Sequence, residues 1–175
     1  MLENIALIGF MGSGKSTIGR HLAKRLDWRL TDTDCLVERV AGCSIPTLFA
    51  RDGEQAFRDQ ETNILLGVTT GERQVVATGG GVVLREENVA ALRGGCLVVY
   101  LTARPDILAE RVGRRPAERP LLAQEDEPVL TRILRMLSER GPLYQRACHV
   151  MVDTSDRAPH AVVEEIVRSW EKARS

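Results

Sequence analysis

The chain has 175 residues, 43% of them hydrophobic, which suits one domain with a sizeable core. Its 24 basic and 24 acidic residues give a formal net charge of zero, and no basic stripe is dense enough to follow a phosphate backbone. These features exclude nucleic acid as the expected partner and favour a small-molecule ligand.

Strand-like apolar runs alternate with helical periodicity from one end of the chain to the other. This alternation is typical of an α/β fold, in which helices cover both faces of a parallel sheet. We expect five strands, near residues 4–9, 29–32, 74–78, 96–101 and 149–153. We expect helices near residues 15–26, 34–41, 53–69, 86–93, 104–112, 127–139 and 159–172. Residues 1–175 are therefore predicted to form a single domain.

Two of the predicted helices carry apolar stripes that we assign to the core. The stripes are Leu130, Ile133, Leu134 and Leu137, and then Val163, Ile166, Val167 and Trp170. The four cysteines lack metal-ligand spacing, so we expect free thiols that serve as small core residues in a reducing compartment: Cys35, Cys43, Cys96 and Cys148. No apolar run approaches membrane-spanning length and the first strand follows Met1 closely, so we expect no signal peptide and a cytoplasmic protein.

The segment Gly9–Thr17 matches the pattern Gly, four residues, Gly, Lys, Ser or Thr. It follows an apolar strand and precedes a helix, which is the order that a phosphate-binding loop requires. Glycines let successive backbone N–H groups converge on phosphate oxygens, and the positive end of the helix dipole adds to the attraction. The alternative, an ordinary glycine-rich turn with an exposed lysine, fits this context less well.

Three side chains at the end of this loop have expected roles. Lys15 is expected to reach the outer phosphates, and it is one of only three lysines in a chain with 21 arginines. Ser16 is expected to place its hydroxyl on a magnesium ion, and Thr17 to cap the helix or lie beneath the loop.

Asp32 and Asp34 follow the second predicted strand, at the edge of the sheet where ligands bind in parallel folds. One carboxylate can orient magnesium or its waters while the other accepts a proton from a substrate hydroxyl. Capping of the next helix explains the pair equally well. The aspartate that often accompanies this loop is missing after the later strands, which favours Asp32 for the metal.

Gly79–Gly81 follow the third predicted strand at the same edge. Their backbone N–H groups are accessible to a hydroxylated substrate, although three glycines also make a plain tight turn. Their position at a strand end favours binding.

Two arginines outside the loop have simple structural explanations. Arg58 has Glu54 four residues before it and Glu61 three residues after it, which predicts a surface ion-pair ladder. Arg140 precedes Gly141-Pro142, where a cation at a helix end interacts favourably with the dipole.

Residues 112–127 lack periodicity and are long for a connection within a compact domain, so we predict either a lid or a disordered segment there. Arg119 lies within this segment. An arginine that closes over phosphates offsets the charge that develops in phosphoryl transfer, which makes Arg119 a candidate for that role.

Taken together, these motifs resemble the shikimate kinase family in order, spacing and total length. They are the glycine loop, Asp32-Thr33-Asp34, Phe57-Arg58, Gly79–Gly81, Arg119-Pro120-Leu121-Leu122 and Arg140-Gly141-Pro142-Leu143-Tyr144. The resemblance implies a three-layer α/β/α P-loop kinase fold with a five-stranded parallel sheet and a mobile lid. It also implies a monomer that phosphorylates the 3-hydroxyl of shikimate with ATP and Mg2+, a step of chorismate and aromatic amino-acid biosynthesis.

The resemblance further implies a role for each matching residue. Nucleotide phosphates would contact Gly12, Ser13, Gly14, Lys15, Ser16 and Thr17, and Mg2+ would be held by Ser16 and Asp32. Asp34 would bind the shikimate hydroxyls and act as the base. The substrate carboxylate would contact Gly80 through its backbone and two arginines, Arg58 and Arg140, whose planar groups allow bidentate pairing. Arg119 would reach ATP and Arg157 would lie near the adenine; Arg111 and Arg114 both fit a second adenine-side position.

Two other functions share the glycine loop. A kinase for gluconate or a nucleoside monophosphate would not need two arginines and a glycine triplet for a carboxylate. A nucleotide-gated switch would usually carry Asn-Lys-x-Asp for guanine, and no asparagine of this chain precedes a lysine.

Overall fold

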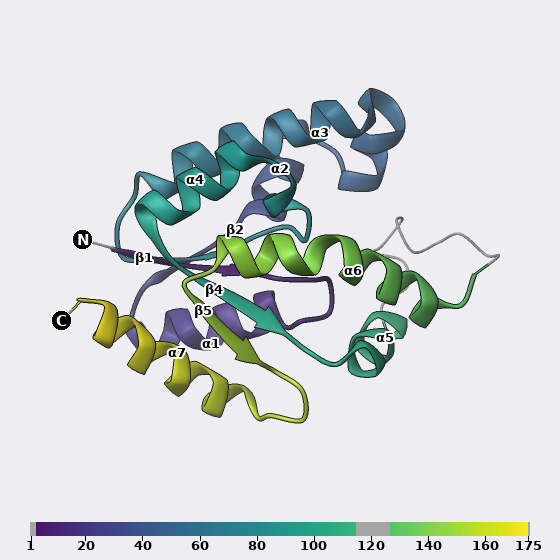
Figure 1. Cartoon of the computed structure of the whole chain (residues 1–175). Coiled ribbons are helices and arrows are strands. Elements are labelled where there is room, and N and C mark those ends of the chain that lie inside the picture. Colours follow the sequence, from purple (N-terminus) through teal and green to yellow (C-terminus); the bar gives the residue numbers. More distant parts are fainter. Residues whose placement is uncertain (1–2, 115–126, 175) are drawn as a thin grey trace.

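In a computed structural model of the chain, which describes residues 3–114 and 127–174, five parallel strands form one sheet in the order β2-β3-β1-β4-β5 (Figure 1). The strands are β1 (Asn4–Ile8), β2 (Arg29–Asp32), β3 (Gln74–Ala77), β4 (Cys96–Thr102) and β5 (Val150–Asp153). The predicted five-stranded parallel sheet is therefore confirmed, with strand ends shifted by a residue.

Helices cover both faces of this sheet. They are α1 (Lys15–Leu26), α2 (Thr33–Ala41), α3 (Ile45–Thr69), α4 (Glu86–Gly95), α5 (Pro105–Gly113), α6 (Val129–Ala147) and α7 (Pro159–Arg174), with a 3-10 turn, η1, at Val82–Leu84. One hydrophobic cluster joins the sheet to α1 and α7, and a second joins it to α3, α4, α5 and α6. The molecule thus has the three layers that the family resemblance implies, as Figure 1 shows.

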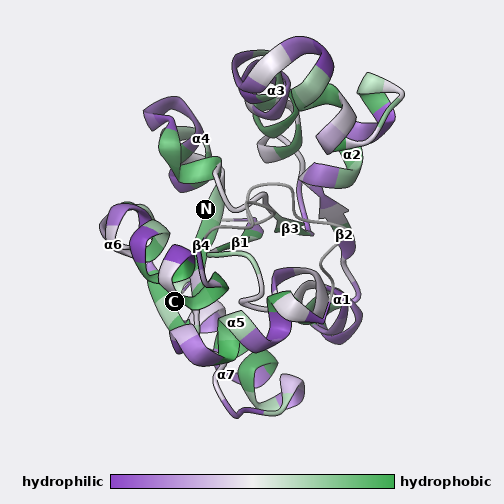
Figure 2. Ribbon diagram, turned by 90° about the vertical axis from the view of Figure 1, so that its right-hand side faces the viewer, coloured by the Kyte–Doolittle hydropathy of each residue, from purple (hydrophilic) through white to green (hydrophobic). Residues whose placement is uncertain are grey.

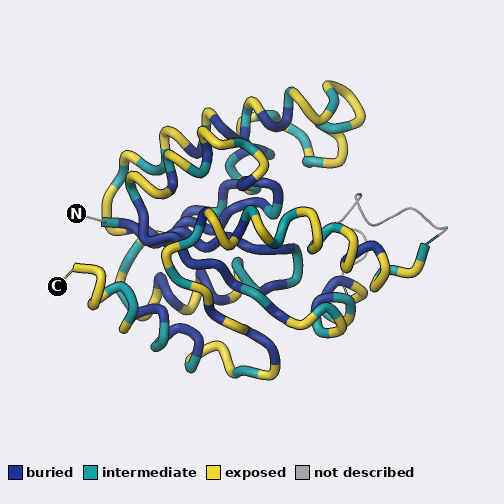
Figure 3. The backbone as a smooth tube through the Cα atoms, viewed as in Figure 1, coloured by how far each residue is buried: buried dark blue, intermediate teal, exposed yellow. Residues whose placement is uncertain are grey.

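The three central strands β1, β3 and β4 are buried on both faces, which explains why they are largely apolar, whereas the edge strands β2 and β5 are partly exposed. Along β1, Ile5 and Leu7 point to the α1 and α7 layer, while Ala6 and Ile8 point to the other layer. All four are fully buried. Figure 3 shows buried residues concentrated in the strands, and Figure 2 shows hydrophilic residues on the outer surfaces of the helices.

The strand order determines where on the sheet a ligand is expected to bind. β1 lies between β3 and β4, and the chain crosses from one side of β1 to the other after β3. In open parallel sheets, a crevice forms where the strand order reverses, outside the carboxyl ends of the strands. The glycine loop, Asp32 and the glycine triplet follow β1, β2 and β3, so all three meet at this crevice.

α3 is longer than predicted, because it begins at Ile45 and not near residue 53. Ser44 caps its start by accepting a hydrogen bond from the N–H of Thr47, and Pro46 lies in the first turn, both ordinary start signals. Gly53 interrupts the helix with φ 82° and ψ 171°, a conformation open mainly to glycine. The short first part of α3 packs through Leu48 against α2, which stabilises it.

α6 was predicted to end at residue 139, and this prediction is wrong. The helix continues through Pro142 to Ala147. A proline inside a helix removes one backbone hydrogen bond and costs about 3 kcal/mol. Burial of Tyr144 and Ala147 in the core offsets this cost. Arg140 is therefore not at a helix end, as its position before Gly141-Pro142 had suggested.

The two apolar stripes have different outcomes. The stripe on α7 is confirmed, and Trp170 packs edge-on against Trp28 with ring centroids 4.9 Å apart. On α6, Ile133 is buried, whereas Leu130 and Leu134 are 42% and 49% exposed. The prediction that both belong to the core is wrong, because those two residues lie on the side of α6 away from the described core.

Two further expectations can be compared with the structure. All four cysteines are free thiols, as predicted, but Cys35 is exposed and only Cys96 is fully buried. Within residues 3–114 and 127–174, no helix has the length and apolar character needed to cross a membrane.

Candidate active site

The glycine loop has the backbone geometry of a phosphate site. Gly12 and Gly14 have φ values of 81° and 100°, which residues with a side chain rarely adopt. A Cβ on Gly9 would collide with the carbonyl oxygen of Leu101, so the loop also depends on close backbone approach. Gly14 is the N-cap of α1 and has no side chain to cap the helix, which leaves the first N–H groups of α1 pointing into the loop.

Side chains of the loop are oriented around this backbone. Lys15 Nζ donates hydrogen bonds to the carbonyls of Gly9 (2.8 Å) and Phe10 (3.0 Å), which holds the ammonium against the loop. Ser13 is buried, and its Oγ has no hydrogen-bond partner among the described residues. Thr17 is exposed toward the cleft, so the expectation that it caps α1 or lies beneath the loop is wrong.

Asp32 caps α2, which is one of the two roles that the sequence left open, and its second carboxylate oxygen lies beside Ser16. Its Oδ1 accepts hydrogen bonds from the N–H groups of Asp34 (3.1 Å) and Cys35 (3.3 Å), so Asp32 is the N-cap of α2. Its Oδ2 accepts a hydrogen bond from Ser16 Oγ at 3.3 Å. A hydroxyl and a carboxylate that meet at the start of α1 are hard oxygen donors of the kind that Mg2+ prefers.

No group of three or more His, Cys, Asp or Glu side chains that could enclose a metal occurs in the described part of the chain. Mg2+ at nucleotide sites takes most of its ligands from phosphates and water and one or two from protein oxygens. The donor set of Ser16 and Asp32 therefore fits Mg2+ bound together with a nucleotide, and does not fit a metal held by the protein alone.

Asp34 lies in the first turn of α2, beside the glycine triplet. Burial and the negative charge of Asp32 raise the pKa of Asp34 to about 6, and the Lys15 ammonium partly opposes this rise. Its Oδ1 is buried and has no hydrogen-bond partner among the described residues. A carboxylate with a raised pKa and an unpaired oxygen in a cleft is a candidate general base.

Gly79–Gly81 make a turn into η1, and each glycine is contacted by a different part of the site. A Cβ on Gly79 would lie 2.6 Å from Asp34 Oδ1 and 2.8 Å from Glu61 Oε1, and one on Gly81 would collide with the Arg58 guanidinium. The carbonyl of Gly80 accepts a hydrogen bond from the hydroxyl of Tyr144. None of the three glycines has a positive φ, so close approach explains Gly79 and Gly81 better than backbone freedom does.

Arg58 forms the predicted ladder with two glutamates, but the ladder is not on the surface. Its guanidinium pairs with Glu61 at 2.8 Å and with Glu54 at 3.1 Å. Arg58 and Glu61 are 7% and 1% exposed. Burial raises the pKa of Glu61, while the charge of Arg58 and its hydrogen bond oppose the rise. The guanidinium is thus fixed beneath the glycine triplet and faces the cleft.

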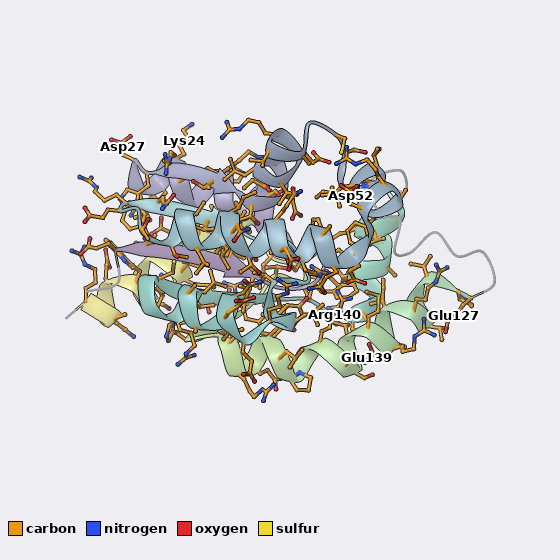
Figure 4. All side chains as sticks on the ribbon, turned by 90° about the horizontal axis from the view of Figure 1, so that it is seen from above. Lys24, Asp27, Asp52, Glu127, Glu139 and Arg140 are labelled. Carbon is orange, nitrogen blue, oxygen red and sulfur yellow. The ribbon has the colours of Figure 1, made fainter. Side chains whose placement is uncertain are left out.

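Arg140 reaches the same place from α6. Figure 4 shows Arg140 on the side of α6 that faces α3, while Glu139 lies on the other side. Arg140 lines the same cleft as Arg58, Glu61 and the glycine triplet. Its positive charge lowers the pKa of Glu61 and of Tyr144 against the effect of burial. Two arginines from helices far apart in the sequence therefore converge next to the glycine triplet.

The far side of the loop carries further arginines. Arg111 donates hydrogen bonds to the Gly12 carbonyl (3.3 Å) and to the hydroxyl (3.0 Å) and carbonyl (2.8 Å) of Thr154. Arg157 donates to the Asp153 carbonyl and pairs with Glu165. Arg114 lines the cleft as well, so the structure leaves both adenine-side candidates in place. Arg119 lies outside the described residues.

All of the described candidates line one cleft of about 1100 Å3. The glycine loop, Asp32 and Arg157 line it, and so do Asp34, the two arginines and the glycine triplet. Sequence reasoning assigned no site role to Glu61 or Tyr144, whereas Arg111 was one of two candidates for an adenine-side position. Glu61 was visible as the partner three residues after Arg58, whereas nothing local in the sequence indicates that Tyr144 contacts the glycine triplet.

Comparison with known proteins matches this chain to shikimate kinases over almost its whole length. The family model described as shikimate kinase matches residues 11–171. The shikimate kinase of Caldanaerobacter subterraneus is 39% identical over 173 residues, which cover 99% of each chain. That of Rippkaea orientalis is 45% identical and covers 95% of this chain and 87% of the relative.

Solved structures agree with the sequence comparisons. The shikimate kinase of Acinetobacter baumannii in complex with shikimate superposes with a TM-score of 0.92 at 35% identity, and the match covers 99% of this chain and 95% of the other. The enzyme from Aquifex aeolicus gives a TM-score of 0.83 at 33% identity, with 98% of each chain covered. The chain therefore belongs to the shikimate kinase family, whose enzymes use ATP with Mg2+ to phosphorylate a hydroxyl of shikimate.

Proposed function

We propose that this chain transfers the γ-phosphate of ATP to the 3-hydroxyl of shikimate, giving shikimate 3-phosphate and ADP for chorismate and aromatic amino-acid biosynthesis. One observation carries the proposal: a phosphate-binding loop and a pair of converging arginines line the same cleft. A volume of about 1100 Å3 is larger than most single-ligand pockets, so the cleft has room for a nucleotide and a small acid together.

The nucleotide is assigned to the side of the cleft that the glycine loop forms. The phosphates contact residues 12–17, through the N–H groups at the start of α1 and the ammonium of Lys15. Ser16 and Asp32 hold Mg2+, which neutralises charge on the phosphate oxygens when it is bound with the nucleotide. Arg157 lies at the adenine end. Arg119, in the lid proposed for residues 112–127, is assigned to the charge that develops on the phosphates during transfer.

The acid is assigned to the other side. Arg58 and Arg140 bind its carboxylate, and the backbone of Gly80 contributes a further hydrogen bond. Asp34 then lies beside the hydroxyls of the substrate, where it orients the reacting hydroxyl and takes its proton as the oxygen attacks. Most of the rate enhancement comes from positioning and charge neutralisation, because phosphoryl transfer requires little covalent work from the protein.

A coupled assay for ADP tests this function. Shikimate should produce rapid ADP release and a product heavier by one phosphoryl group in mass spectrometry. Gluconate, nucleoside monophosphates and buffer alone should give only background hydrolysis. ADP release that is indifferent to shikimate would overturn the proposal and favour a nucleotide-gated switch, and selective turnover of gluconate would favour a different kinase.

We further propose that the protein acts as a cytoplasmic monomer without a nucleic-acid partner. The balanced charge and the shape of the site, which is complete within one chain, support this assignment. Light scattering coupled to size-exclusion chromatography should give a mass close to 19.4 kDa, and a mass twice as large would contradict it.

A further inference from the structure

The hydroxyl of Tyr144 makes a contact with the glycine triplet that the reaction described above does not use. It donates a hydrogen bond to the carbonyl of Gly80. Tyr144 belongs to α6 and is fully buried, and Gly80 lies 64 residues earlier at the mouth of the cleft. The contact therefore links a helix of the core to a backbone segment that faces the substrate.

The core fixes the position of this hydroxyl. The Tyr144 ring stacks on Tyr100 of β4, with centroids 5.0 Å apart and planes inclined by 22°. Both rings belong to the hydrophobic cluster between the sheet and α6. A tyrosine held in this way has little rotamer freedom, so its Oη acts as a fixed point for whatever it contacts.

The hydroxyl of Tyr144 fixes the orientation of one peptide plane in the glycine triplet. The carbonyl of Gly79 accepts a hydrogen bond from Val82 N–H at 3.3 Å, and that of Gly81 accepts one from Leu84 N–H at 3.0 Å. The carbonyl of Gly80 receives the Tyr144 hydroxyl instead. That carbonyl shares a rigid peptide plane with the N–H of Gly81, so Tyr144 also sets the direction of this N–H. Between two glycines such a plane turns easily unless something holds it.

Arg140 connects Tyr144 to the other half of the acid pocket. It lies four residues before Tyr144 on α6, so both side chains lie on the same face of the helix, and the charge of its guanidinium acts on the Tyr144 hydroxyl. Burial raises the pKa of Tyr144 well above its ordinary value, although the charges of Arg140 and Arg58 oppose the rise. The phenol therefore stays protonated and remains a hydrogen-bond donor at every pH at which the enzyme would work.

We propose that Tyr144 is a positioning residue that fixes the Gly80–Gly81 peptide plane relative to Arg140, and so sets the affinity for the substrate carboxylate. This inference rests on the proposed function. Tyr144 touches neither reactant in this scheme. It acts through the backbone of Gly80, which is assigned to the acid, through the adjoining Gly81 peptide, and through the guanidinium of Arg140; all three residues line the cleft.

The substitution Tyr144→Phe tests the proposal, because it keeps the stacked ring and removes only the hydroxyl. Loss of one hydrogen bond that positions a charged subsite should raise KM for shikimate by on the order of tenfold. KM for ATP should stay within about twofold, since the nucleotide contacts are elsewhere. Tyr100→Phe is the matched control: it removes a hydroxyl from the other ring of the same stack and should leave both KM values unchanged.

A double-mutant cycle separates positioning from general weakening. If Tyr144 acts through Arg140, the effects of Tyr144→Phe and Arg140→Ala on KM for shikimate should be clearly less than multiplicative in the double variant. Equal loss for both substrates in Tyr144→Phe, or a loss matched by Tyr100→Phe, would show a merely structural role and overturn the proposal. An unchanged KM for shikimate in Tyr144→Phe would also overturn it.

A spectroscopic measurement separates this inference from the proposed function. In the free protein, the amide resonance of Gly81 should shift or broaden in Tyr144→Phe and remain in place in Tyr100→Phe. This result does not depend on turnover. Wild-type protein that is inactive on shikimate would refute the function while the resonance still reports on the peptide plane. Active wild-type protein with an unmoved Gly81 resonance in Tyr144→Phe would refute the positioning role alone.

Discussion

Replacement of Asp34 by Asn should abolish most activity and yet stabilise the protein at neutral pH. The pKa of Asp34 rises from 3.8 to about 6 in the folded state, mainly because of burial and Asp32. A raised pKa means that folding disfavours the ionised carboxylate. The resulting destabilisation is absent below the unfolded-state pKa and complete once the pH exceeds the folded-state value.

The size of this effect follows from the shift. At about 1.4 kcal/mol for each pKa unit, ionised Asp34 costs the fold about 3 kcal/mol above pH 7. At pH 5 only about half of this cost is present, because the group is still largely protonated in the folded protein. Asn has nearly the same shape as Asp and no charge, so Asp34→Asn should recover most of that free energy at pH 7.5 and about half of it at pH 5.

Urea unfolding of both proteins at pH 5, 6 and 7.5 measures the difference. The variant should be more stable throughout, with an advantage that grows toward pH 7.5. Turnover should fall by about 10² to 10⁴-fold, and kcat/KM of the wild type should decline below pH 6 as Asp34 becomes protonated. Asp52→Asn is a suitable control, because Asp52 is exposed beside Arg51, which lowers its pKa, and its loss should not stabilise the protein. A stability difference that does not vary with pH, or an Asp34→Asn protein that is less stable at pH 7.5, would refute this reasoning.

Three further changes test other parts of the site. Gly81→Ala should raise KM for shikimate by at least about tenfold, because the new Cβ collides with the Arg58 guanidinium. Gly94→Ala is the control, because Gly94 has open space around it and its substitution should leave the kinetics unchanged. Equal kinetics in the two variants would disprove the close packing at Gly81. Arg58→Ala should destabilise the fold by about 3 kcal/mol, because it leaves Glu61 buried without its cation. Adding Glu61→Gln should recover much of the lost free energy of unfolding, measured in urea. If the double variant recovers none, the broken ion pair does not cause the destabilisation. Lys15→Met should reduce kcat by about 10² to 10³-fold in the ADP assay while the circular dichroism spectrum stays unchanged, and normal turnover would contradict a phosphate contact.

Features encoded in continuous segments were predictable from the sequence. The phosphate loop is one: its glycines, lysine and serine are adjacent in the chain, and the flanking strand and helix follow from apolar spacing. The central strands β1, β3 and β4 were equally clear, because a strand buried on both faces is largely apolar. The sequence also placed Asp32, Asp34 and the glycine triplet at one edge, since carboxyl ends of parallel strands must meet there.

The course of α6 was decided by tertiary structure. Local rules end this helix before Gly141-Pro142, and they would be right for an isolated peptide. Burial of Tyr144 and Ala147 against the sheet outweighs the cost of the proline, so the helix continues. That continuation carries Arg140 and Tyr144 on one rigid element.

The character of the arginines was decided in the same way. Spacing alone makes Arg58 part of an exposed ladder, because Glu54 and Glu61 are its helical neighbours. Whether such a ladder faces water or a cleft depends on what packs over it, and here the glycine triplet covers the Arg58 guanidinium. Chain segments that lie far apart in the sequence supply those contacts, so the sequence determined which groups are present and only the folded structure decided which of them meet.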